Sequence, residues 1–386
     1  MIASRARFLT SIADIDAVTW NALTGEPFLR HEFLLALEES GCTTARTGWA
    51  PQHLVLEDAR GHALGALPLF RKAHSRGEFV FDFSWANAYA QHGLKYYPKL
   101  LSAVPFTPVT GPRFLVNPAA DAPAVTAAMI RLASDFARSE RLSSWHVLFP
   151  CENEARALDR AGLILRRDCQ FHWYNRGYES FDAFLATFTA EKRKKAKRER
   201  RRVAEAGIEF DTRSGDEMTE ATWRRVYEFY TDTFYRHGHE PYLNLQFFKR
   251  IAATMPETLM LKIARLGREP IGVAIFFVGE DALYGRYWGA SGNYHSLHFE
   301  TCYYQGIDYC IEKKLQRFEP GTQGEHKVPR GFVPTLTSSA HYVQDERFAS
   351  AIREFAAREA RGVYSYAAAV NEHVPYHRAP DEELRL

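Results

Sequence analysis

The sequence has little cysteine and no long hydrophobic run. Only five of its 386 residues are cysteine, their number is odd, and none stands in a CxxC pair. This usage argues against a disulfide framework or a zinc ribbon and favours a reducing cytoplasm. No stretch approaches the roughly 18 apolar residues of a membrane span, and residues 1–20 lack the apolar run of a signal peptide. We therefore expect a cytoplasmic protein without a transmembrane segment, and peripheral contact with a membrane stays open.

Short motifs of several large enzyme classes are also missing. The chain has no P-loop, no GxGxxG and no GxSxG, which argues against kinases, dehydrogenases and α/β-hydrolases. It has no HExxH and no Cys/His set with zinc spacing, so the histidines at 237 and 239 and at 295 and 298 are weak metal candidates. We predict no metal site and no tightly bound cofactor. The formal net charge is only +2, so attraction to anions must come from local clusters.

The order of predicted elements indicates two α/β domains. A length of 386 residues and a hydrophobic fraction of 46% allow a core in each half. In the first half we predict strands over 53–57, 63–70, 78–83, 145–149 and 163–174, with a helix over 122–139. In the second half we predict strands over 208–212, 259–265, 271–278, 282–288 and 317–320, with helices over 220–234, 245–254, 297–314 and 345–358. Strands that alternate with helices in this way predict mixed sheets covered by helices. We place the domains at 1–178 and 179–386, the second opening with a basic helix over 181–206.

A basic run begins the second half. Nine of the eleven residues from Lys192 to Arg202 are Lys or Arg, interrupted by Ala196 and Glu199. Like charges four residues apart repel one another on a helix, so solubility alone would intersperse more acids. Three interpretations stay open: a solvated helix, a site for a diphosphate or another anionic substrate, and a contact with nucleic acid such as a transfer RNA. The candidate anion-binding residues are Arg193, Lys197 and Arg198.

Unusual polar residues gather between 284 and 341. Arg286, Tyr287 and Trp288 end a predicted strand, and His298 and Glu300 stand at the start of the long helix that follows. A second group leaves the short strand at 317–320 through a glycine-containing stretch, and its members are Glu319, Gln323, Glu325, His326, Lys327 and Arg330. Taken singly, each could be a helix-dipole partner or a solvated loop charge. Together they offer an acid, a base and a cation within a few residues, which is typical of a catalytic site.

Six short stretches of sequence resemble one family. They are YYPKLL and VPFTPVTGPR within 96–113, HFETCYYQ at 298–305, FEPGTQGEHK at 318–327, Arg330-Gly331, and SAH at 339–341. In this order and over nearly the whole chain, they resemble the FemAB-like predicted N-acyltransferases of the GNAT superfamily. The basic helix is similar to one that opens the second domain of the Fem peptidyltransferases, where it meets a nucleotide-sugar diphosphate.

The resemblance implies an enzyme with two GNAT folds in tandem. The strands at 282–288 and 317–320 would splay apart and hold the acyl donor between them. The expected reaction forms an amide on a small-molecule or peptide amine, from acyl-CoA or aminoacyl-tRNA as co-substrate, in peptidoglycan metabolism. The turn at 289–296 does not meet the Q/R-x-x-G-x-G/A pattern of coenzyme A binding, so the donor stays open. A non-catalytic GNAT-fold module that binds a cell-wall fragment or RNA is the alternative, and the oligomeric state is left open.

The hypothesis of a direct acyl transfer to an amine suggests roles for residues. Lys327 or Arg286 would stabilise the oxyanion, and the base would come from Glu319, Glu325 or His326, with Glu300 as a further catalytic candidate. Tyr287, Trp288, His298, Gln323 and Arg330 would bind substrate beside Arg286, and the first domain would line the acceptor side with Tyr97, Lys99 and Arg113.

Overall fold

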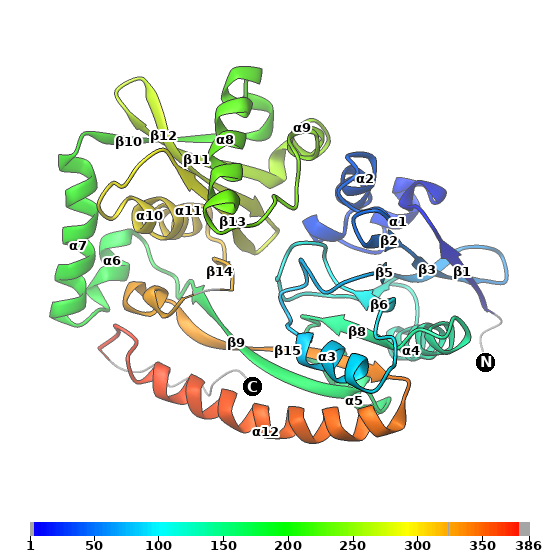
Figure 1. Ribbon diagram of the computed structural model, residues 1–386. Coiled ribbons are helices and arrows are strands. Elements are labelled where there is room, and N and C mark those ends of the chain that lie inside the picture. The colour runs from blue at the N-terminus through cyan, green and yellow to red at the C-terminus, as the bar shows by residue number, and fades with distance from the viewer. Residues whose placement is uncertain (1–3, 323, 378–386) are drawn as a thin grey trace. The chain divides into compact units, whose positions relative to one another are not determined.

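A computed structural model describes residues 4–322 and 324–377 of the chain (Figure 1). These residues divide into two compact units. One contains the chain up to Asp168 together with Thr337–Tyr364, and the other contains Cys169–Leu336 together with the chain from Ser365. The predicted boundary at residue 178 separates halves of the sequence, and as a division into folding domains it stays a prediction.

The first unit contains two sheets. An antiparallel sheet has the order β1 (Ser4–Leu9), β3 (His53–Asp58), β4 (Ala63–Leu67), β7 (Leu115–Val116). The other has the order β2 (Trp49–Pro51), β5 (Phe70–Lys72), β6 (Lys99–Ser102), β8 (Ser144–Leu148) and the part of β15 (Val333–Val343) from Thr337 on, and within it β6 and β8 are parallel. Its helices are α1 (Ala17–Asn21), α2 (His31–Glu39), α3 (Phe83–Gln91), α4 (Ala122–Ser139), α5 (Glu152–Arg160) and α12 (Glu346–Asn371) as far as Tyr364.

Helix α4 shows why this unit packs as it does. Asp121 caps its first turn by accepting a hydrogen bond from the Ala124 amide. Val125, Met129 and Ala133 follow at intervals of four residues and therefore lie on one side of the helix. That side is buried in a core with Trp145 of β8, so the helix between β6 and β8 covers their sheet.

The second unit contains one mixed sheet. An antiparallel ladder joins β10 (Ile208–Ser214), β11 (Leu259–Leu266), β12 (Glu269–Val278) and β13 (Ala282–Ala290). β14 (Arg317–Glu319) runs parallel to β13, and the part of β9 (Ile164–Tyr174) from Cys169 on runs antiparallel to β14. Its helices are α6 (Phe181–Ala186), α7 (Ala190–Glu205), α8 (Glu220–Arg236), α9 (Leu245–Thr254), α10 (Leu297–Phe299), α11 (Gln305–Lys313) and the end of α12 (Glu346–Asn371).

Helix α8 lies very close to β13. A Cβ placed on Gly289 would stand 1.9 Å from the backbone oxygen of Phe229 on that helix. Only glycine allows this approach, which brings the helix against the end of the strand where candidate site residues lie.

Two strands are exchanged between the halves of the sequence. β9 closes the first half, yet its Trp173 pairs with Phe318 of β14. β15 belongs to the second half, yet its Ser339 pairs with Leu148 of β8. Each sheet is therefore completed by a strand from the other half of the chain.

The structure corrects four predicted elements. The expected strand over 78–83 is wrong, because Glu78 and Asp82 turn inward toward a buried lysine and α3 begins at Phe83. The basic helix is two helices, α6 and α7, since the Thr187 hydroxyl bonds the Phe184 carbonyl and ends α6. The helix over 297–314 contains a π-helical turn, Glu300–Tyr304, and the last helix extends beyond residue 358 to Asn371.

Candidate functional site

The candidate site of the second unit begins where β13 and β14 separate. The two strands are paired over only three residues, from Ala282 with Arg317 to Tyr284 with Glu319. β13 then continues to Ala290 while β14 ends at Glu319. Arg286 is the extra residue of a bulge in the β12–β13 ladder, between the pairs of Tyr287 and Gly285. Bulges redirect side chains and are frequent beside active sites.

An aromatic cluster follows this separation. The His298 ring lies 5.6 Å from Trp288 and 5.3 Å from Tyr303, and the Tyr303 ring lies 5.7 Å from His326, between ring centroids. Phe299 packs against both His298 and His326. Tyr303 belongs to the π-helical turn, an element that often marks functional sites because it shifts side chains off the regular helix.

Lys327 is buried beside this cluster. Lys327 belongs to a short 3₁₀ helix, Glu325–Arg330, and is 2% exposed. Its ammonium donates to the carbonyl of Gly321, and no described carboxylate pairs with it. Burial lowers the pKa of Lys327 to about 7. A buried amine without an acidic partner costs stability, so its presence points to a chemical role.

His326 and Tyr303 form a hydrogen-bonded pair next to Lys327. The hydroxyl of Tyr303 lies 2.8 Å from Nε2 of His326. Burial raises the pKa of Tyr303, which therefore stays a phenol and donates the hydrogen bond. Burial, with Lys327 and Arg330, lowers the pKa of His326 below its usual value. Neutral His326 thus carries its proton on Nδ1. The neighbouring His298 is also neutral, because burial lowers its pKa to about 4.

A buried ion pair fixes this loop to helix α7. Arg330 donates from Nε and from a terminal nitrogen to the two carboxylate oxygens of Glu199, at 3.1 and 2.7 Å. The hydroxyl of Tyr304 donates to the same carboxylate at 2.6 Å. Arg330 also lies 3.3 Å above the ring centroid of Phe299 and donates to the His326 carbonyl. The guanidinium therefore joins the loop to α7 and to Phe299 of α10, while Tyr304 connects the π-helical turn to the same carboxylate.

The predicted acids lie in different surroundings. Glu319 is buried and accepts from Arg317 at 3.0 Å. Glu325 is exposed and accepts from the Tyr366 hydroxyl at 2.8 Å. Glu300 is buried, where Arg200 contacts it at 3.1 Å and Gln305 donates to it at 2.8 Å, and burial raises its pKa. Their catalytic roles stay predictions.

Arg286 and Tyr287 both lie near Tyr230 of helix α8. The Tyr287 ring packs 4.9 Å from Tyr230 of α8, on the helix side of the sheet. Arg286 lies 5.4 Å from the Tyr287 ring, and burial lowers its pKa below the usual value for arginine. Gln323, the remaining substrate-binding candidate, lies outside the described residues.

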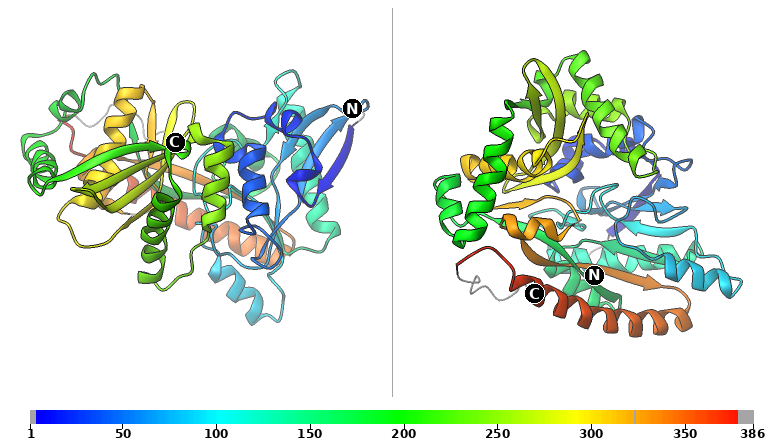
Figure 2. Two further views of the ribbon diagram at one scale, coloured as in Figure 1. Left: turned by 90° about the horizontal axis from the view of Figure 1, so that it is seen from above. Right: turned by 60° about the vertical axis from the view of Figure 1, so that its left-hand side comes forward.

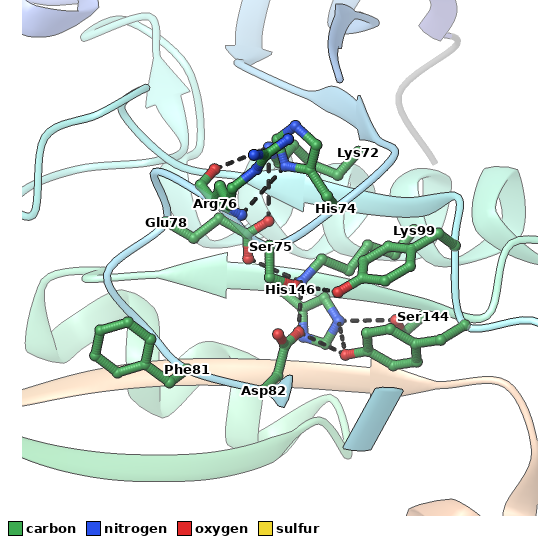
Figure 3. A network of polar contacts seen from close by, with 12 residues as sticks. Lys72, His74, Ser75, Arg76, Glu78, Phe81, Asp82, Lys99, Ser144 and His146 are labelled. Atoms are coloured by element: carbon green, nitrogen blue, oxygen red, sulfur yellow. Dashed lines mark hydrogen bonds and ion pairs between the residues drawn. The ribbon is translucent and has the colours of Figure 1, made fainter. Parts of the chain in front are cut away.

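In the first unit, Lys99 lies at the centre of a buried charge network (Figure 3). Its ammonium donates to Ser75 and to Glu78, both at 2.8 Å, and also contacts Asp82. The Tyr97 hydroxyl lies 2.8 Å from the same serine. This network binds the 75–82 loop to β6, which explains the burial of Lys99 without a ligand.

Arg113 has a comparable structural setting. It is 1% exposed and donates to backbone carbonyls, among them Leu148 at 2.8 Å and Pro112 at 2.8 Å. The same segment is held by Glu154, which accepts from the Arg113 and Phe114 amides at 2.9 Å. That Tyr97, Lys99 and Arg113 line an acceptor site stays a prediction.

The candidate anion-binding residues lie on α7 but have different contacts. Lys197 forms an ion pair with Asp182 at 2.9 Å, Arg193 is half-buried, and Arg198 is exposed. Within the described residues, no group of three His, Cys, Asp or Glu side chains could hold a metal ion. Over the same part of the chain, no helix has both the length and the apolar character that a membrane crossing needs.

A family model described as peptidoglycan biosynthesis/recognition matches residues 11–378, almost the full sequence. The chain belongs to the FemAB-like family. This membership confirms the resemblance and the expected class of enzyme, a transferase. No curated relative of the sequence is found at a significant level.

Solved structures share the fold of this FemAB-like chain. The structure of FemX is 11% identical with a TM-score of 0.52, covering 90% of this chain and 100% of its own. The C-terminal domain of a putative lysylphosphatidylglycerol synthetase from Agrobacterium fabrum is 9% identical with a TM-score of 0.53, covering 89% and 96%. The structure of L-PGS from Bacillus licheniformis is 9% identical with a TM-score of 0.50, covering 83% of this chain and 92% of its own. The predicted fold class, two GNAT-like α/β domains in tandem, is confirmed.

The structure adds residues that sequence reasoning missed in this FemAB-like chain. Tyr303, Phe299 and Glu199 contact His326 or Arg330 directly. The sequence did set Glu199 apart, since it is one of the two residues that interrupt the basic run from Lys192 to Arg202. Tyr303 carried none beyond its place in the HFETCYYQ block.

Proposed function

We propose that the second unit transfers an acyl group to an amine and that Lys327 stabilises the oxyanion of the tetrahedral intermediate. One observation carries the proposal: Lys327 is buried, has no acidic partner among the described residues, and donates to the carbonyl of Gly321. Gly321 lies close to Gly285 of β13, just beyond the last residue pair with β14. A charged donor in a desolvated site binds a developing oxyanion far better than one in water. Its pKa of about 7 keeps an ammonium available near neutral pH.

The proposed reaction is a direct displacement. The amine nitrogen attacks the carbonyl carbon of an ester or thioester, and the carbonyl oxygen becomes the oxyanion that Lys327 binds. The C–N bond forms, the C–O or C–S bond breaks, and the leaving alcohol or thiol takes up the proton that the amine releases. The Tyr303–His326 pair is suited to carry this proton, because neutral His326 accepts at Nε2 and Tyr303 donates there.

For the substrates, the family description supports a peptide amine of the peptidoglycan type as acceptor. The donor is an activated acyl group, either aminoacyl-tRNA or acyl-CoA. Thermal-shift measurements with charged transfer RNA, acetyl-CoA and a long-chain acyl-CoA separate these donors. A ligand at about 100 times its dissociation constant adds about 2.7 kcal/mol to the stability.

The decisive experiment compares Lys327→Met with a matched control, Lys262→Met. Lys262 is a second buried lysine of the same unit, on β11 and 9% exposed. With the stabilising donor from the thermal-shift assay, we expect Lys327→Met to lose about 10²–10³ in kcat, the effect of removing one oxyanion donor. Lys262→Met should keep wild-type turnover. Equal activity of the two variants would remove Lys327 from the mechanism.

Two further variants separate the roles of the charges. Lys327→Arg keeps a cation that does not titrate near neutral pH, so it should retain part of the turnover and lose the limb of the pH profile near 7. Glu325→Gln tests the exposed acid, and a wild-type rate in this variant would exclude Glu325 as the base.

A further inference from the structure

The outward side of α7 is a continuous cationic surface. Its exposed basic residues are Lys194, Lys195, Lys197, Arg198, Arg201 and Arg202. The opposite side is buried through Ala196, Glu199 and Val203, so the helix has a fixed orientation. In the views of Figures 1 and 2, α7 lies at the outer edge of its unit, and among the described residues no helix or strand lies over its outward side. We call these six residues the α7 face.

Most of this charge is not neutralised within the protein. Lys194, Lys195 and Arg198 have no acidic partner among the described residues. Lys197 pairs with the exposed Asp182 at 2.9 Å, and Arg201 pairs with Glu205 at 3.5 Å, both of these side chains being 66% exposed. Such exposed ion pairs contribute little to the stability of the folded protein.

The spacing of the cations on the α7 face shows that they repel one another. Lys194 and Arg198, Lys197 and Arg201, and Arg198 and Arg202 are each four residues apart, the distance at which like charges destabilise a helix. The α7 face extends over roughly 12 Å along the helix, at about 1.5 Å per residue. One diphosphate contacts only part of such a surface, so the complementary partner is an extended array of anions.

The side chains that are missing from the α7 face distinguish between two such arrays. Single-stranded nucleic acid is bound by aromatic stacking as well as charge, and the major groove of duplex RNA is too deep and narrow for side chains to read. The exposed residues of α7 include no aromatic side chain and no Asn, Gln, Ser or Thr. A bilayer of anionic lipids requires only clustered Lys and Arg on one side of a helix.

We propose that the α7 face docks the protein reversibly on an anionic phospholipid bilayer. No exposed apolar side chain of α7 larger than alanine would enter the hydrocarbon layer, so the contact is electrostatic and depends on salt. The proposal does not depend on the proposed acyl transfer, because it concerns a surface outside the Lys327 site.

The test is sedimentation of the full-length protein with vesicles. Phosphatidylglycerol–phosphatidylcholine vesicles are compared with pure phosphatidylcholine vesicles, at physiological salt and at about 1 M salt, where screening shortens to about 3 Å. The variant combines Lys194→Glu, Lys195→Glu and Arg198→Glu. The control reverses three exposed cations of the first unit, Arg60→Glu, Lys95→Glu and Arg131→Glu, and so changes the net charge equally.

We expect binding to the anionic vesicles only, with loss at high salt. The α7 variant should lose at least about 100-fold in affinity, since each cation near such a surface contributes about fivefold, and the control should lose much less. Equal losses in the two variants would overturn the proposal, because net charge would then explain the binding. Absence of binding to the anionic vesicles, or binding of the α7 face to RNA but not to vesicles, would overturn it as well.

Discussion

The ion pair between Glu199 and Arg330 allows a quantitative prediction. Both side chains are nearly buried, at 8% and 4% exposure, and the Glu199 carboxylate accepts three hydrogen bonds. Glu199→Ala leaves a guanidinium charge and a tyrosine hydroxyl in the interior without their acceptor. Removing one partner of such a pair costs about 3–5 kcal/mol, a large part of the roughly 5–15 kcal/mol by which a domain is stable.

Urea denaturation followed by tryptophan fluorescence measures this loss, with an unchanged m value as the sign that the unfolded state is unaffected. Glu205→Ala is the matched control on the same helix. Glu205 is 66% exposed and lies 3.5 Å from Arg201, so its removal should cost less than about 1 kcal/mol. Replacing both buried partners, as Glu199→Leu with Arg330→Met, should restore most of the stability. A Glu199→Ala variant as stable as Glu205→Ala would refute the idea that this pair holds the loop to α7.

Three further predictions concern stability. Burial lowers the pKa of Lys327 from 10.5 to about 7, so between these pH values the unfolded chain binds one proton more than the folded chain, and the free energy of unfolding rises with pH. Lys327→Met should remove this one-proton contribution from the slope of the free energy of unfolding against pH, measured by urea titrations at pH 7 and 9. Burial lowers the pKa of His341 from 6.5 to about 3, so its contribution to the free energy of unfolding is complete above pH 6.5 and is lost as the pH falls toward 3. His341→Gln should therefore reduce the slope of the free energy of unfolding against pH in this acid range by up to about 1.4 kcal/mol per pH unit. An unchanged slope would contradict a buried neutral histidine. Gly289→Ala places a Cβ 1.9 Å from the Phe229 oxygen and should lower the free energy of unfolding by about 1–3 kcal/mol or more, as measured by thermal or urea unfolding. In the control Gly292→Ala, the atom nearest to the new Cβ lies at 3.4 Å, so this free energy should hardly change.

The order of elements in the second half could be predicted because each strand and helix there has a clear apolar period. The loop that carries His326 and Lys327 was also predictable, since glycines and opposite charges follow a short strand. The expected strand over 78–83 failed for a physical reason. The apolar run 79–81 is typical of a strand, but the flanking Glu78 and Asp82 are buried against Lys99, and an apolar run alone cannot show that neighbouring polar side chains have buried partners.

The contacts that complete the site could not be predicted. Glu199 meets Tyr304 and Arg330 across 105 and 131 residues of sequence, and Tyr303 meets His326 across 23. Periodicity places a residue on a side of its own helix, but it does not identify which distant segment packs there. For the same reason, the exchange of β9 and β15 could not be read from two halves with similar element order.

That exchange affects how the protein is made. β8 ends at Leu148, but the strand that covers its edge ends at Val343. At about 5–20 residues per second, a ribosome needs about 10–40 s to make the intervening chain. During this time the edge of β8 has no partner from its final sheet, and unpaired edges are templates for aggregation. The nascent chain therefore completes its first unit only after nearly all of the second has been synthesised, and a gene cut between the halves would leave each product without a strand.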